Sequence, residues 1–93
     1  MTEIAVDAQP QGNGWLCRVT ITDDAGRSEH RVTVVPADLD RYAPGASDPA
    51  DLVRRSFEFL LGREPRQSIL AAFDLPVIER YFRDYPEAIR PGS

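Results

Sequence analysis

The sequence contains no lysine, a single cysteine and a single histidine. One cysteine excludes a disulfide within the chain and is typical of a reducing compartment. Without lysine there is no phosphate-binding loop of the GxxxxGKS type, and the GxGxxG, GxSxG and HExxH motifs are absent as well. Structural zinc sites take four Cys or His ligands, and catalytic zinc sites usually take three protein ligands. We therefore expect no catalytic, cofactor-binding or metal-ligating residues and no enzymatic activity.

Basic charge and long apolar runs are also scarce. The 11 basic residues are outnumbered by 15 acidic ones, and the net charge of −4 argues against a general binder of nucleic acid or anionic membranes. All the basic residues are Arg, which fits codon usage in a GC-rich genome or, alternatively, an Arg-based surface for anions or a partner. No apolar run approaches the ~18 residues that span a bilayer, and the N-terminus lacks the regions of a secretory signal. These features predict a cytoplasmic, bacterial-type protein.

Three segments near the N-terminus have the alternating pattern of half-buried β-strands, namely Thr2–Ala8, Trp15–Thr22 and Ser28–Val35. The turn sequences QPQGNG and DDAG separate them. A four-residue loop between the second and third segments places the apolar side chains of both on one face of the sheet. A different register would separate them, so side-chain direction fixes this pairing. In this register Trp15 faces Val34, Cys17 faces Val32, Val19 faces His30 and, on the outer face, Arg18 faces Arg31.

The clearest helix signal lies between Asp48 and Gly62. Asp48 is a natural N-cap, Pro49 suits the first helical position and Gly62 is a common C-terminal stop. At ~100° per residue, the apolar side chains cover an arc of roughly 200°, about twice what one contact with a sheet requires. We infer that the sheet covers one side of this helix and the C-terminal segments cover the other. The arc consists of Leu52, Val53, Ser56, Phe57, Phe59, Leu60 and Leu61.

The C-terminal part contains shorter helical patterns. Pro65 is expected to open a short helix that carries Ile69, Leu70 and Phe73, and a second pattern runs from Pro76 to Pro86. The predicted fold is therefore α+β, with a three-stranded antiparallel meander packed on a main helix and two shorter C-terminal helices. Residues 1–93 form a single domain, with the antiparallel sheet over 1–35, a connection with a short helical turn over 36–47, the helical part over 48–86 and a frayed tail over 87–93.

Cys17 and His30 are the only residues that suggest nucleophilic catalysis. They share a sheet face but are diagonally offset, whereas a Cys–His pair needs hydrogen-bond contact, an orienting group and a cleft. On the apolar side of a sheet, cysteine acts as a small hydrophobe. Asp23 and Asp24 weakly resemble a calcium loop, but the spaced acidic ligands and closing Glu of an EF-hand are missing, so we interpret them as turn residues.

Three sets of side chains are candidates for a binding surface. The first set flanks the main helix and forms either a solvated face or a docking patch: Arg54, Arg55, Arg63 and Arg66. The second is aromatic and is expected in the core, with a ligand cage as the alternative: Phe73, Tyr81, Phe82 and Tyr85. The third lies on the outer sheet face and favours a partner, weak self-association or nucleic acid: Leu16, Arg18, Thr20, Arg31, Thr33 and Val35.

The run LVRRSFEFLLGREPRQSIL, followed by FDLPVIERYF, resembles a family of short bacterial proteins that is classed as a domain of unknown function. The similarity covers roughly residues 48–85, with a weaker match in WLCRVTITDDAG. More loosely, strands ahead of a helix are similar to small antitoxin and double-stranded-RNA-binding folds, although the basic helix ends and loops of those folds are not evident. The resemblance implies no activity, cofactor or site residue.

The predicted function is a non-catalytic protein-interaction module with an unknown protein partner or weak homo-oligomer formation. No membrane association is expected, and nucleic acid is the less favoured partner because the chain is acidic. The first alternative is a nucleic-acid-binding or antitoxin-like regulatory protein that uses the outer sheet face. The second, ranked last, is a small enzyme that uses Cys17 or His30.

Overall fold

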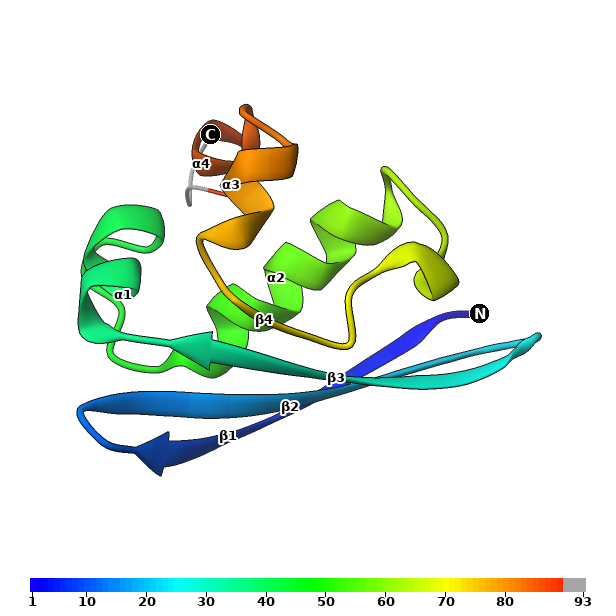
Figure 1. Ribbon diagram of the computed structural model, residues 1–93, viewed down its shortest axis with the longest axis horizontal. Coiled ribbons are helices and arrows are strands. Elements are labelled where there is room, and N and C mark those ends of the chain that lie inside the picture. The colour runs from blue at the N-terminus through cyan, green and yellow to red at the C-terminus, as the bar shows by residue number, and fades with distance from the viewer. Residues whose placement is uncertain (90–93) are drawn as a thin grey trace.

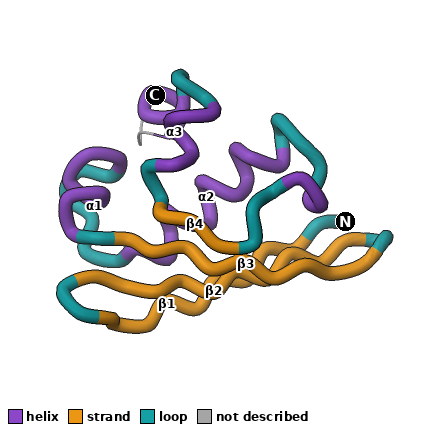
Figure 2. The backbone as a smooth tube through the Cα atoms, in the orientation of Figure 1, coloured by secondary structure: helices purple, strands orange, loops and turns teal. Residues whose placement is uncertain are grey.

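The computed structural model describes residues 1–89 and forms an α+β domain with a sheet on one side and helices on the other (Figure 1). The strands are β1 (Glu3–Gln11), β2 (Gly14–Asp23), β3 (Gly26–Val34) and β4 (Ala72–Asp74). The helices are α1 (Pro36–Tyr42), α2 (Pro49–Leu61), the 3-10 helix η1 (Arg66–Ser68), α3 (Val77–Tyr81) and α4 (Tyr85–Ile89). All the helices of residues 1–89 lie on the same face of the sheet, and none of these described residues forms an element on its other face (Figure 2).

The first three strands form the predicted antiparallel meander, and the predicted register is confirmed. Cys17 lies opposite Val32, and Val19 lies opposite His30, on the face beneath the helices. The second hairpin is closed by the carboxylate of Asp23, whose Oδ1 accepts hydrogen bonds from the backbone N–H groups of Ala25 (2.8 Å) and Gly26 (3.0 Å). Gly26 has φ +148°, a backbone conformation that residues with a side chain rarely adopt.

The prediction of three strands is wrong, because a fourth strand follows η1. The expected helix after Pro65 is reduced to the single 3-10 turn of η1, and the chain then extends as β4 in parallel with β3. At the two ends of this ladder, Arg31 N–H donates to the Ala71 carbonyl (2.8 Å) and Leu75 N–H donates to the Thr33 carbonyl (3.0 Å). This pairing joins segments about forty positions apart, so the local spacing of apolar residues does not reveal it.

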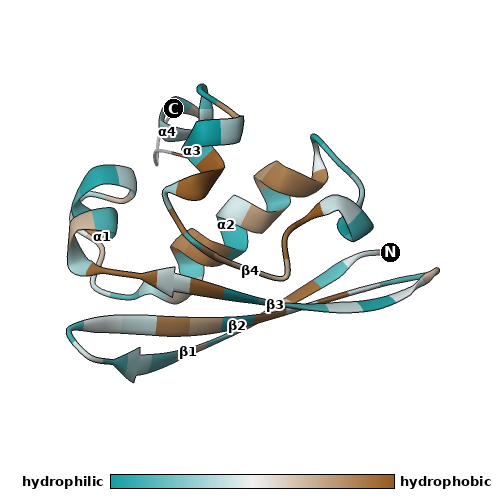
Figure 3. Cartoon of the chain, in the orientation of Figure 1, coloured by the Kyte–Doolittle hydropathy of each residue, from teal (hydrophilic) through white to brown (hydrophobic). Residues whose placement is uncertain are grey.

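Helix α2 has the predicted bounds and caps, and its wide apolar arc is covered on two sides. The Asp48 side chain accepts a hydrogen bond from Ala50 N–H at 2.9 Å, which satisfies one free donor of the first turn. Apolar residues recur along α2 and through the strands beneath it (Figure 3). Phe57 is fully buried against the sheet side, where its ring meets His30 and Phe73, while Phe59 packs against Tyr85 on the opposite side.

The C-terminal helical pattern is interrupted at Phe82, whose φ of −133° and ψ of 96° end α3. Helix α4 then begins at Tyr85 and runs through Pro86, which a first helical turn tolerates because its N–H groups have no intrahelical partner. The buried Tyr85 hydroxyl forms a 2.6 Å hydrogen bond with the Ser56 hydroxyl and ties α4 to α2. Helix α4 extends to Ile89, within the segment expected to fray, and residues 90–93 of that segment lie outside the described residues.

The longest helix of residues 1–89 is α2, with 13 residues, and none of the helices described there is long and apolar enough to cross a membrane.

Candidate functional site

Cys17 and His30 lie where the sequence places them, on the inner face of the sheet, and no hydrogen bond within residues 1–89 joins them. Cys17 is fully buried and has Val32 as its cross-strand neighbour. Burial, followed by the negative charges of Asp48 and Asp7, raises the pKa of the Cys17 thiol to about 11. The thiolate that a nucleophile requires is therefore disfavoured at neutral pH.

Both ring nitrogens of His30 are used within the fold. Nδ1 lies 2.8 Å from the Leu70 carbonyl, and Nε2 lies 2.9 Å from the Ser28 hydroxyl. A carbonyl only accepts, so Nδ1–H donates to Leu70, while Nε2 and the Ser28 hydroxyl share the second hydrogen bond. The imidazole packs on Phe57 with ring centroids 5.4 Å apart and is only 3% exposed. His30 thus anchors the backbone at Leu70.

The described residues contain no group of three or more His, Cys, Asp or Glu side chains that could hold a metal ion. Asp23, part of the weak calcium-loop pattern, instead pairs with Arg66, whose Nε lies 3.0 Å from Asp23 Oδ2. The hydrogen bond from Arg66 is the main cause that lowers the pKa of the Asp23 carboxyl. This ion pair fastens η1 to the β2–β3 hairpin.

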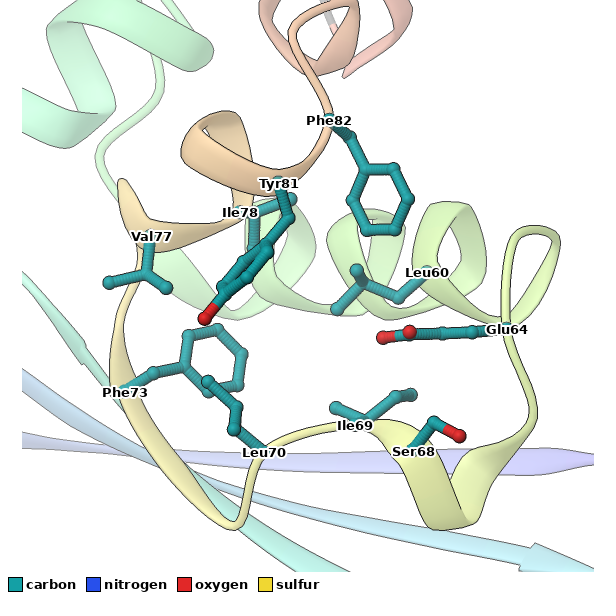
Figure 4. A pocket seen from close by; sticks show the side chains of 10 residues that line it. All are labelled: Leu60, Glu64, Ser68, Ile69, Leu70, Phe73, Val77, Ile78, Tyr81 and Phe82. Carbon is teal, nitrogen blue, oxygen red and sulfur yellow. The ribbon is translucent and has the colours of Figure 1, made fainter.

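A largely apolar groove of about 460 Å³ lies between the C-terminal end of α2, the segment from η1 to β4, and α3. We call it the α3 groove. Its volume falls within the range of about 300–1,000 Å³ that is common for ligand pockets. Its lining consists of Leu60, Glu64, Ser68, Ile69, Leu70, Phe73, Val77, Ile78, Tyr81 and Phe82 (Figure 4).

The floor and the rim of the α3 groove differ in exposure. Ile69, Ile78 and Leu60 are buried and form the floor, at 7%, 3% and 4% exposure. Leu70 and Tyr81 are large apolar side chains of the lining that remain 47% and 69% exposed. In the view of Figure 4, Tyr81 reaches from α3 across the groove toward the side of Leu70. A partner that covered these two side chains would remove further apolar surface from water.

Among residues 1–89, Glu64 supplies the only carboxylate of the lining. Figure 4 shows its side chain directed into the α3 groove, between Leu60 and Ile69. The side chain is partly buried, and within residues 1–89 its carboxylate takes part in no hydrogen bond or ion pair. A single negative charge beside an apolar surface favours a ligand with a cationic group next to an apolar one.

Three tertiary contacts hold the walls of the α3 groove in place. The Leu70 carbonyl is bound by His30, and η1 is held by the pair of Arg66 with Asp23. On the third side, the Arg63 guanidinium lies over the Phe59 and Phe82 rings, with centroid distances of 4.6 and 5.8 Å, and pairs with Asp84. The walls of the α3 groove are therefore positioned by contacts from β3, from the β2–β3 hairpin and from the segment that follows α3.

The aromatic set predicted from helical spacing is only partly in the core. Tyr85 is fully buried, Phe73 and Phe82 are half-buried, and Tyr81 is exposed. The sequence thus identified three residues of the α3 groove but missed Leu70 as a rim residue and Glu64 as its carboxylate. The position of β4 brings Leu70 into the groove, and no local signal in the sequence marks that strand.

The arginines that flank α2 are engaged within the fold. Arg54 donates to the Ile4 carbonyl at 2.6 Å, Arg55 donates to the Ile89 carbonyl, and Arg63 and Arg66 form the ion pairs described above. These contacts favour a structural role for this set over a free docking patch.

The outer sheet face carries charges of both signs. Arg18 and Arg31 are exposed and opposite each other, as the register predicted, and Asp7 lies on the other side of Arg18. In the neighbouring row, Glu29 lies opposite Thr20 and approaches Arg27 at 3.6 Å. A continuous basic surface for phosphates is therefore not present on this face of the described residues.

No protein-family model matches the chain, and neither the curated proteins nor the solved structures contain a significant match to it. The resemblance to a family of short bacterial proteins stays a prediction.

Proposed function

We propose that this domain is a non-catalytic protein-interaction module that binds an apolar segment of a partner protein in the α3 groove. The supporting observation is the exposure of Leu70 and Tyr81 beside a hollow whose floor is apolar. The other large apolar side chains exposed in residues 1–89, Met1 and Val35, belong to neither wall of this groove. Exposed apolar side chains that gather around a hollow are typical of interaction sites, whereas scattered ones are ordinary.

The partner segment carries a large apolar side chain close to an Arg or Lys. The apolar side chain fills the space above Ile69 and Ile78, and the cation lies beside the Glu64 carboxylate. The acidic net charge of −4 supports a basic partner segment and disfavours phosphate-rich ligands. A lone buried cysteine fits the reducing cytoplasm, where we place the protein.

The two alternative functions have less support. Nucleic-acid binding through the outer sheet face needs a basic surface, and Asp7 and Glu29 lie among its arginines. Catalysis by Cys17 or His30 needs an accessible, activated group, and both residues are buried, with the His30 nitrogens already bound.

Selection from a library of random peptides displayed on phage tests the proposal. We expect the enriched peptides to share one or two large apolar residues beside an Arg or Lys. Binding of these peptides should be lost with Leu70→Glu and with Tyr81→Glu, because each variant places a charge on the rim of the α3 groove.

Gln9→Glu serves as the matched control, since it adds the same charge on an exposed residue of β1 and should leave binding intact. The proposal is wrong if no peptide family is enriched. It is also wrong if the two rim variants bind the selected peptides as well as the Gln9→Glu control does.

A further inference from the structure

The two edges of the sheet are built differently. The two-residue turn after Gln11 makes Gln11 and Gly14 a hydrogen-bonded pair. Because such pairs alternate along an antiparallel ladder, the odd-numbered residues of β1 bond to β2, and the even-numbered residues direct their backbone groups to the open side. Arg54 covers this edge at one end by donating to the Ile4 carbonyl at 2.6 Å. At the other end Pro10 has no N–H to offer. Both devices hinder the pairing of another strand with β1.

Within residues 1–89, the edge formed by β4 has no such protection. The bonds from Arg31 N–H to the Ala71 carbonyl and from Leu75 N–H to the Thr33 carbonyl set the parallel ladder. In this ladder Phe73 directs its N–H and C=O groups to β3, and Ala72 and Asp74 direct theirs away from the sheet. Both residues are exposed, and outside the ladder no hydrogen bond within residues 1–89 involves their backbone groups.

This open edge runs between two hollows. The α3 groove lies on the inner side, where the Phe73 side chain points. A shallow hollow on the outer side, which we call the outer hollow, is lined by Leu16, Arg31 and Thr33 together with Ala72 and Asp74. Leu70, Phe73 and Val77 contribute to both hollows, so the β4 edge forms the ridge that separates them.

We propose that the partner segment binds as an extended strand on the open edge of β4. This inference rests on the proposed function and specifies the conformation of the bound segment. Successive side chains of a strand point to opposite faces, so alternate residues of the partner would enter the α3 groove and the others would lie over the outer hollow. The residue that enters the groove is large and apolar, and the Arg or Lys that meets Glu64 lies two positions away on the same face. Hydrogen bonds to Ala72 and Asp74 supply affinity that does not depend on the partner's sequence.

Backbone N-methylation of a selected ten-residue peptide tests this inference, because it removes one N–H at a time without changing the protein. We expect affinity to fall by at least about tenfold at alternate positions and to change little at the positions between them. Amide hydrogen exchange supplies the second measurement. The amides of Ala72 and Asp74 should slow on peptide binding, while those of Val6 and Ala8 on the β1 edge serve as internal controls and should not.

The outcomes separate the two proposals. If the peptide binds but N-methylation shows no alternation and the Ala72 and Asp74 amides are unchanged, the strand inference is wrong and the interaction module stands with a differently shaped ligand. If no peptide binds the α3 groove, the proposed function itself fails. If these two amides are already protected in concentrated free protein and become exposed on dilution, the occupant of the edge is a second copy of the chain, which overturns the inference.

Discussion

At the scale of single residues, the side chains that look chemically reactive serve the fold. His30 connects β3 to the Leu70 carbonyl, 40 positions further along the chain, and so fixes one wall of the α3 groove. The buried hydroxyls of Ser56 and Tyr85 bond to each other and join two helices. Each of these polar groups has a partner, as buried polar groups require, and in residues 1–89 no fully buried side-chain nitrogen or oxygen lacks one.

Cys17 gives a prediction at this scale. Its pKa is raised from 9.0 to about 11 because the folded protein disfavours the thiolate, so the thiol should be inert near neutral pH. Reaction with a thiol reagent at pH 8 should be much slower in the native protein than in denaturant, and the native rate should rise as the pH approaches 11. Because the pKa of Cys17 is higher in the folded protein than in the unfolded chain, the thiol makes its full contribution to the free energy of unfolding below pH 9. This contribution is lost as the pH rises toward 11. Rapid modification of the native protein at pH 8 would contradict the structural role.

At the scale of elements, α2 is the centre of the core because both the sheet and the C-terminal helices pack on it. Phe57→Ala and Leu60→Ala should each lower the free energy of unfolding by ~2–5 kcal/mol, as expected when a large buried side chain is truncated. Glu58→Ala, at an exposed position of the same helix, is the control and should change it by less than ~0.5 kcal/mol. Denaturant unfolding measures all three. A loss under ~1 kcal/mol for both Phe57→Ala and Leu60→Ala would mean that α2 is not the core.

The elements also show how far the sequence predicts this structure. The bounds of α2 and the register of the meander were predicted because their signals are local: a cap, a proline, a glycine and the alternation of apolar side chains. β4 was missed because it has three residues and is fixed by hydrogen bonds to a distant strand. The helical spacing of Phe73, Tyr81 and Phe82 is a local signal, so the sequence identifies them as a cluster. The roles of Leu70 and Glu64 in the α3 groove depend instead on where β4 lies.

At the scale of the whole molecule, the two sides of the domain have different characters. The outer face of the sheet mixes acidic and basic residues, whereas the helical side presents the α3 groove beside the β4 edge. The arginines next to α2 are used to hold this architecture together, which leaves the groove as the favoured surface for a partner. Weak self-association through the outer face, the other possibility that the sequence raised, stays a prediction.

We expect Leu70 and Tyr81 to serve binding and not folding. The most direct test is the double variant Leu70→Ser/Tyr81→Ser, with its free energy of unfolding and its affinity for a selected peptide measured side by side. We expect stability to change by no more than about 1 kcal/mol, because both side chains are exposed, and affinity to fall by at least about tenfold. Val35→Ser, which truncates an exposed apolar side chain that does not line the α3 groove, should leave the peptide affinity unchanged. Unchanged peptide affinity, or a loss of stability as large as that of Phe57→Ala, would contradict the claim.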